Sequence, residues 1–195
     1  MIERRGEAEA AGSGFPTYAA KIAATWLLCA LVWHLWSAPS GQAALQSYVG
    51  AVGTLAIFAL VAAFLLAVGL YCRTLQRCLS LVAMPHRAAD PMSVWLMFLI
   101  PYNFIEDFFI VNAVAGSLRR EAAKNPRLNG ISRFGTWSGN GWCAAQLLSL
   151  IPSSIGEAAG LAAIVLWARH WHFVAQVSRL LEGGNKAREK NGYLG

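Results

Sequence analysis

Charged residues are scarce in this sequence: they make up 13% of its 195 residues, whereas 56% are hydrophobic. A soluble domain usually carries about 25% charged residues and under half apolar ones. The apolar residues also cluster in blocks that contain almost no Lys, Arg, Asp or Glu. Four blocks of about 20 residues leave too little chain for a separate soluble core. We therefore predict an all-α integral membrane protein with four membrane-embedded helices.

The sequence also lacks the motifs of common enzyme and cofactor sites. It contains no H-E-x-x-H zinc motif, no G-x-S-x-G nucleophile turn and no glycine-rich phosphate loop. The predicted topology puts His34 on the opposite face from His170 and His172, so these side chains cannot share a haem iron. None of the four cysteines belongs to a C-x-x-C pair: Cys29, Cys72, Cys78 and Cys143. We predict no catalytic residue, no metal and no cofactor.

The hydrophobic blocks define one membrane domain, at residues 18–182, between two flexible polar tails, at 1–17 and 183–195. Its predicted segments lie at about residues 22–37, 43–71, 92–116 and 142–168. A cleaved signal peptide is the rival interpretation of the first block, but its acidic leader of 21 residues favours an uncleaved helix. Tryptophans stand at the ends of several blocks, as Trp142 and Trp167 do, which predicts an aromatic belt at the level of lipid headgroups.

The 16 basic residues flank the hydrophobic blocks and form no aromatic-rich basic run. This placement predicts contact with a lipid bilayer and not with nucleic acid. The first connection has no Lys or Arg, which predicts cytoplasmic N- and C-termini. The third connection, residues 118–141, is basic although simple alternation puts it outside. Either all four segments cross, which we favour, or the third and fourth are re-entrant and every basic segment stays inside.

Two prolines interrupt the third and fourth blocks in the same local pattern. The sequence reads LIPYNFIE around Pro101 and LIPSSIGE around Pro152, with a glutamate five positions after each proline. Proline removes a backbone donor and disturbs the preceding helical turn. We therefore predict that both segments are kinked or broken at Pro101 and Pro152.

Polar side chains follow these breaks and form a candidate intramembrane site. Helical spacing puts Asn103, Glu106 and Asp107 on one face of the third segment, and a second polar stripe includes Gln146, Ser153 and Glu157. Paired interrupted segments often enclose a binding site. The alternative is a packing network of interhelical hydrogen bonds, which Gly156 and Gly160 would also suit.

The stretches 91–120 and 137–181 resemble an uncharacterised bacterial membrane family catalogued as domain of unknown function 4328. The resemblance rests on PMSVWLMFLIPYNFIEDFF, GTWSGNGWCAAQLLSLIP and VLWARHWHFVAQVSRL. The chain departs from the family pattern where the acidic pair Glu106/Asp107 replaces a second proline after the asparagine. The resemblance implies four helices in a bacterial inner membrane and implies no chemistry.

Two classes of function follow from these observations. The first is a small non-enzymatic membrane protein that binds a partner, either another membrane protein or a second copy of itself, and stabilises a complex. The second is a small transporter or channel that uses Glu106, Asp107 and Glu157 to carry protons or cations. An intramembrane enzyme is a third hypothesis that no motif supports.

Overall fold

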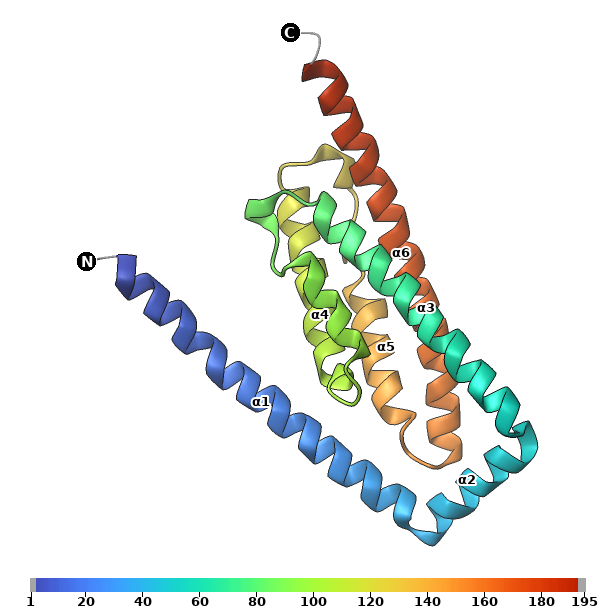
Figure 1. Ribbon diagram of the computed structural model, residues 1–195. Coiled ribbons are helices and arrows are strands. Elements are labelled where there is room, and N and C mark those ends of the chain that lie inside the picture. The colour runs from blue at the N-terminus through green and yellow to red at the C-terminus, as the bar shows by residue number, and fades with distance from the viewer. Residues whose placement is uncertain (1–2, 193–195) are drawn as a thin grey trace.

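The computed structural model describes the backbone of residues 3–192 and the side chains of residues 16–184 (Figure 1). This part of the chain contains helices and no strand, as the sequence predicts. The elements, in chain order, are α1 (Glu3–Ser37), α2 (Pro39–Val52), α3 (Thr54–Leu81), η1 (Met84–His86), η2 (Pro91–Phe98), α4 (Asn103–Ala122), η3 (Pro126–Leu128), α5 (Thr136–Leu148) and α6 (Ser154–Gly192).

Both predicted polar tails have helical backbone where they are described. Helix α1 begins at Glu3 and α6 continues to Gly192, while residues 1–2 and 193–195 lie outside the described residues. Alanine and glutamate, both strong helix formers, supply six of the 17 residues of the first tail, and three glycines oppose them. The flexibility of the tails stays a prediction.

The predicted second segment, residues 43–71, is divided between two helices. Helix α2 ends at Val52 and α3 begins at Thr54, with Gly53 between them at φ +80°. A residue with a side chain rarely adopts this backbone conformation, whereas glycine does so readily. The glycine therefore allows the chain to bend between two apolar helices that the sequence pattern joins into one.

The chain reverses direction at both predicted proline breaks. Pro101 lies in the turn between η2 and α4, and Pro152 lies in the turn between α5 and α6 (Figure 1). Helix α5 packs against α6, and η2 against α4, so each interrupted segment forms a hairpin. The breaks predicted at these prolines are confirmed, because neither helix continues through its Leu-Ile-Pro sequence.

Two helices of the described chain, not four, are long and apolar enough to cross a membrane. They are Pro16–Ser37 in α1 and Thr54–Leu81, the whole of α3. The prediction of four spanning helices is wrong on this criterion. The prediction fails because the blocks at 92–116 and 142–168 are each divided by a proline turn into shorter helices.

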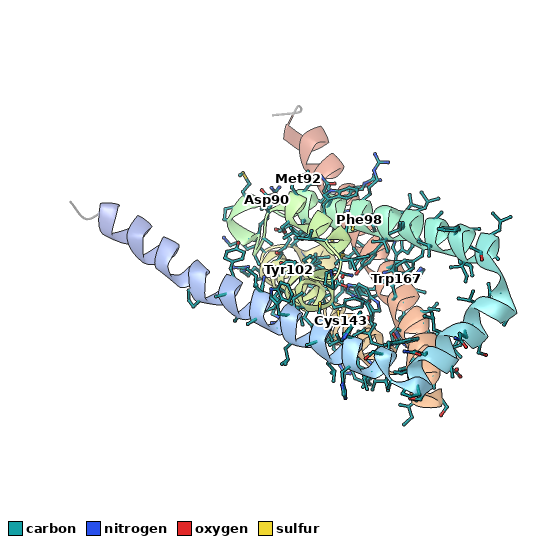
Figure 2. The ribbon with its side chains drawn as sticks, turned by 60° about the horizontal axis from the view of Figure 1, so that its bottom comes forward. Asp90, Met92, Phe98, Tyr102, Cys143 and Trp167 are labelled. Atoms are coloured by element: carbon teal, nitrogen blue, oxygen red, sulfur yellow. The ribbon has the colours of Figure 1, made fainter. Side chains whose placement is uncertain are left out.

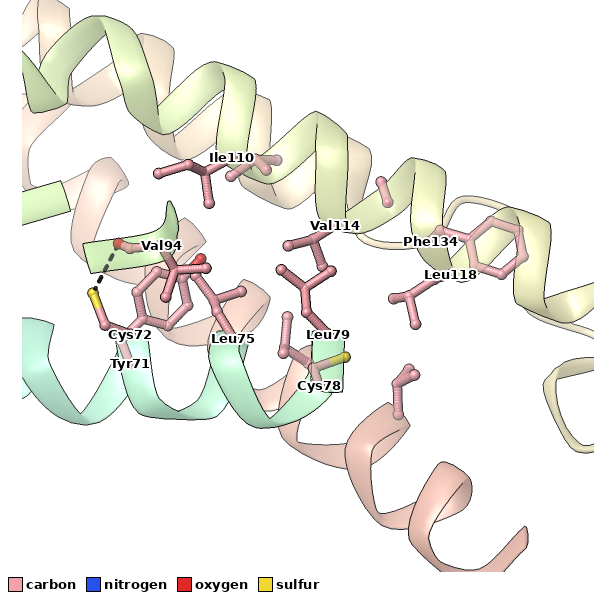
Figure 3. Packing of buried hydrophobic residues seen from close by; sticks show 14 of the residues in the cluster. Tyr71, Cys72, Leu75, Cys78, Leu79, Val94, Ile110, Val114, Leu118 and Phe134 are labelled. Carbon is pink, nitrogen blue, oxygen red and sulfur yellow. Dashed lines mark hydrogen bonds between the residues drawn. The ribbon is translucent and has the colours of Figure 1, made fainter. Parts of the chain in front are cut away.

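Burial divides the molecule into two halves. The apolar half, residues 16–70 and 144–166, carries most of the exposed large hydrophobic side chains, among them Leu55, Phe58 and Trp33. The bundle half, residues 71–143 and 167–184, contains nearly all of the buried core. Figure 3 shows how Leu75 and Leu79 of α3 meet Val94 of η2 and Val114 of α4 in that core. The hydrophobic effect thus holds the bundle half together, and the apolar half has little core of its own.

The connection between α3 and α4 is fixed to α4 by a buried carboxylate. Glu121 Oε2 lies 2.7 Å from His86 Nδ1 and accepts a hydrogen bond of 3.2 Å from the Ala83 amide. Burial alone would raise the pKa of Glu121, but the hydrogen bonds from His86, Ala83 and Asn125 outweigh it and lower the pKa below its ordinary value. Glu121 therefore favours its ionised form in the folded protein.

Helix α5 approaches its neighbours closely at Gly139. A Cβ atom there would collide with Val111 of α4 and with the ring of His170 of α6. We expect Gly139→Ala to lower the stability of the protein by about 1–3 kcal/mol, because a packed interior tolerates added volume poorly. The thermal midpoint of the purified protein in detergent measures this. Gly50→Ala is the matched control, because nothing lies within 4 Å of the added atom. An equal loss in both variants would contradict the packing explanation.

Candidate functional site

The predicted polar site is divided within the first turns of α4. Neighbouring residues on a helix project about 100° apart. Glu106 therefore faces α1, where it meets Lys21, while Asp107 faces α3 and α5. The sequence prediction placed these carboxylates together on one face. In the structure they instead make two separate contacts.

Asp107 lines a small cavity of about 30 Å³, which we call the Asp107 pocket. Its other polar lining residues are Asn103 of α4 and Gln146 of α5, both predicted from the sequence. Gln146 Nε2 donates to Asp107 Oδ2 over 3.4 Å, and the Asp107 residue is only 2% exposed. The pocket thus joins two predicted residues of the third segment to one of the fourth.

Four buried polar atoms at the Asp107 pocket have no hydrogen-bond partner among the described residues. They are Tyr71 Oη, Asn103 Oδ1, Asp107 Oδ1 and Trp167 Nε1. Buried polar atoms in native proteins almost always have partners, which can be an ordered water or an ion. One water needs roughly 10–15 Å³, so the pocket has room for a water molecule or a small cation.

An aromatic cluster forms the wall of this pocket. The ring of Tyr71 lies 5.6 Å from the rings of both Trp142 and Trp167, edge-on to each, and the two indoles stack at 6.2 Å. Figure 2 views the molecule from the end of the two proline turns and labels Trp167 among the crowded side chains. Trp142 is 8% exposed, so it belongs to the core and not to a lipid-facing belt. The sequence interpretation missed this because a block end does not reveal which way an indole points.

Glu106 forms a buried ion pair with Lys21 of α1. Its Oε2 atom lies 2.6 Å from Lys21 Nζ, and the two side chains are 8% and 10% exposed. The ammonium group also lies 4.0 Å from the ring centroid of Phe109, a favourable cation–π distance. Lys21 therefore does not extend freely to a headgroup layer but holds α1 against α4.

The remaining predicted residues lie at the turn between α5 and α6. Tyr48 of α2 donates a hydrogen bond of 2.6 Å to Glu157 Oε1, and both residues are exposed. Ser153 Oγ accepts a hydrogen bond from the Gly156 amide at the start of α6. The predicted stripe from Gln146 to Glu157 is not continuous, because the chain reverses at Pro152 between them.

His170 is buried in the bundle half and is not an interfacial side chain. Its Nδ1 atom lies 3.1 Å from the Gly135 carbonyl, and the residue is 1% exposed. Burial lowers the pKa of His170 to about 4, although the carbonyl contact opposes this shift. The ring is therefore neutral near pH 7. Among the described residues, no group of three or more His, Cys, Asp or Glu side chains is arranged to hold a metal ion.

Comparison with known proteins adds no relative: no family model, no curated protein and no solved structure matches the chain significantly. The resemblance of residues 91–120 and 137–181 to the uncharacterised membrane family stays an expectation.

The Lys21–Glu106 pair makes a prediction about stability. We expect Lys21→Met to destabilise the protein by about 3–5 kcal/mol, because Glu106 would be left buried without a counter-charge. The double variant Lys21→Met/Glu106→Met should recover much of that loss, since neither charge then remains. Thermal unfolding in detergent provides the measurement.

The exposed pair between Arg77 and Glu182 serves as the control. The Arg77 side chain is 67% exposed, so Glu182→Gln should cost about 1 kcal/mol or less. If Lys21→Met/Glu106→Met were as unstable as Lys21→Met alone, Lys21 and Glu106 would not stabilise the protein as an ion pair.

Proposed function

We propose that this chain is a small polytopic membrane protein of the bacterial inner membrane that acts by binding a partner, without catalysis. The exposed apolar half carries this proposal. Leu55, Trp33 and Phe58 are 84%, 77% and 68% exposed, and only 6% and 11% of the two apolar spans are buried. A soluble protein rarely exposes so large an apolar surface, whereas a bilayer would cover it. The family resemblance supports the choice of a bacterial inner membrane.

The distribution of basic residues supports one orientation in the bilayer. Within residues 16–184, every Lys and Arg except Lys21 belongs to the bundle half. Residues 38–53, 99–102 and 149–153, which lie at the end of the molecule away from the basic connections, contain neither Lys nor Arg. Basic segments remain on the cytoplasmic side, so the end of the bundle half that carries the basic connections and both termini are cytoplasmic in this proposal.

The hairpins remove the conflict over the third connection. Helix α4 returns the chain from the Pro101 turn to the basic end of the molecule before the segment at residues 123–135 begins. The segment can therefore be cytoplasmic without an unfavourable crossing. This supports the re-entrant interpretation of the third segment over four alternating crossings. Helices α5 and α6 would then enter and leave the membrane from the same side.

The separation of the carboxylates favours an accessory protein over a transporter that uses all three. Glu106 is neutralised by Lys21 of α1, whereas Glu157 is exposed at the turn between α5 and α6 and bonds to Tyr48 of α2. No continuous acidic path joins them in the part of the chain that the structure describes. The exposed face of α1 can instead be covered by another membrane protein or by a second copy of this chain.

Reporter fusions test the orientation. We expect a reporter inserted at Asn129, or fused at the C-terminus, to be active only as a cytoplasmic reporter, and one at Gln42 in α2 to be active only outside. An external signal at Asn129 would contradict the hairpin topology. Resistance of the protein to extraction with alkaline carbonate would test membrane insertion itself.

A second candidate function is the binding of a monovalent cation or a proton at Asp107. The unpartnered oxygens of Tyr71, Asn103 and Asp107 favour it, because oxygen donors suit hard cations. Asp107 supplies a single negative charge, which matches a monovalent ion better than a divalent one.

Sodium-dependent stability distinguishes this candidate from a water-filled pocket. If the pocket binds Na⁺, sodium chloride should raise the thermal midpoint of the wild-type protein above that in choline chloride. Asp107→Asn should abolish the difference, because it removes the charged ligand. Glu157→Gln is the matched control and should retain the difference. An unchanged wild-type midpoint would leave Asp107 as a packing residue with a buried water.

A further inference from the structure

A basic groove of about 890 Å³ lies between α3 and α6. It belongs to the bundle half and begins where the exposed apolar face of α3 ends. Its residues come from the last three turns of α3, from Pro91, and from the facing turns of α6: Leu70, Arg73, Thr74, Gln76, Arg77, Ser80, Pro91, Trp171, Ala175, Ser178, Arg179 and Glu182.

Three arginines and one glutamate give the groove a net charge of +2. Arg77 pairs with Glu182, which neutralises one arginine. Arg73 and Arg179 form no ion pair within the described chain and are exposed. Two guanidinium groups are thus available to a ligand, and guanidinium binds phosphate oxygens in a bidentate manner.

The other polar groups of the groove are already engaged within the protein. Thr74 Oγ1 donates to the Leu70 carbonyl and accepts from Trp171 Nε1, and Ser178 Oγ donates to the Val174 carbonyl. These contacts fix the floor of the groove and leave the arginines as its free donors. The ligand chemistry that the groove favours is therefore anionic.

The position of the groove indicates a lipid as the source of the anion. Leu66 and Leu70 of α3 are 67% and 47% exposed, and Arg73 follows within one turn. In the proposed orientation, acyl chains would lie along α3 and their headgroups would stand at the level of Arg73. Charge and depth thus agree on an anionic phospholipid of the cytoplasmic leaflet.

We propose that the groove between α3 and α6 binds the phosphate headgroup of an anionic phospholipid through Arg73 and Arg179. This inference rests on the proposed placement of the apolar half in a bilayer. The site would anchor the bundle half at the membrane surface and select anionic lipids over zwitterionic ones.

Lipid titration of the full-length protein in detergent tests the site. Phosphatidylglycerol should raise the thermal midpoint, and phosphatidylcholine should not. Arg73→Gln/Arg179→Gln should weaken the apparent affinity for phosphatidylglycerol at least about tenfold, because it removes two charge-assisted contacts. Both side chains are exposed, so the variant should fold, and circular dichroism with gel filtration checks this.

The matched control is Arg119→Gln/Arg120→Gln, which removes two exposed arginines from the end of α4, outside the groove. It should change the affinity less than about threefold. An equal loss in both double variants would show diffuse charge attraction and overturn the site. Inorganic phosphate that reproduces the stabilisation through Arg73 would overturn the lipid assignment. Release of the protein by alkaline carbonate would instead contradict the bilayer placement, whatever the titration gives.

Discussion

Helix termination at the two Leu-Ile-Pro sequences is the constraint on which the arrangement depends. A proline within a helix removes a backbone hydrogen bond and crowds the preceding turn. At Pro101 and Pro152 the chain turns back, so that η2 lies along α4 and α5 lies along α6. Because of these reversals, both basic connections of the bundle half lie at the same end of the molecule. A continuous helix at Pro101 would move the connection at residues 123–135 to the opposite end, and one at Pro152 would carry α6 away from α5.

The same turns determine what each carboxylate contacts. Asp107 lies one turn after the Pro101 break, at the level of Tyr71, where three helices and their aromatic side chains meet. Glu106, its neighbour in sequence, points to α1 and is neutralised there. The two adjacent carboxylates are thus compensated differently: Glu106 has a positively charged partner, whereas Asp107 has only a hydrogen bond from the Gln146 amide. Any ligand in this region would therefore meet Asp107 first.

The sequence predicts the features that depend on local chemistry and misses those that depend on the direction in which a side chain or a helix points. Helical structure, the two apolar spans and the breaks at Pro101 and Pro152 follow from composition and from the missing backbone donor of proline. Gly53 was missed as a helix boundary because the segment around it is apolar apart from Thr54. The placement of Asn103 and Asp107 on one face of α4 follows from helical spacing, whereas the turn of Glu106 toward α1 does not. Tyr71 and Trp167 were not found as pocket residues, although a lone tyrosine after an aliphatic run is a signal, since its hydroxyl usually needs a partner when buried.

The two halves of the molecule are held together by different forces. The bundle half buries a continuous hydrophobic core, and in aqueous surroundings the hydrophobic effect stabilises that core. In the apolar half, lipid would solvate the side chains as well as other helices do, so packing there gains little from the hydrophobic effect. In such surroundings, polar contacts between helices become the main interactions that determine which helix faces pack together.

Three such contacts connect the first two helices to the rest of the chain. Lys21 of α1 pairs with Glu106 at 2.6 Å, Trp36 Nε1 of α1 donates to the Leu150 carbonyl at 2.8 Å, and Tyr48 of α2 bonds to Glu157. The Leu150 carbonyl can accept because it lies in the Pro152 turn, outside any helix. The second and third contacts lie at or next to that turn, and the first lies just after the Pro101 turn. The proline breaks thus both reverse the chain and supply the polar groups that hold α1 and α2 in place.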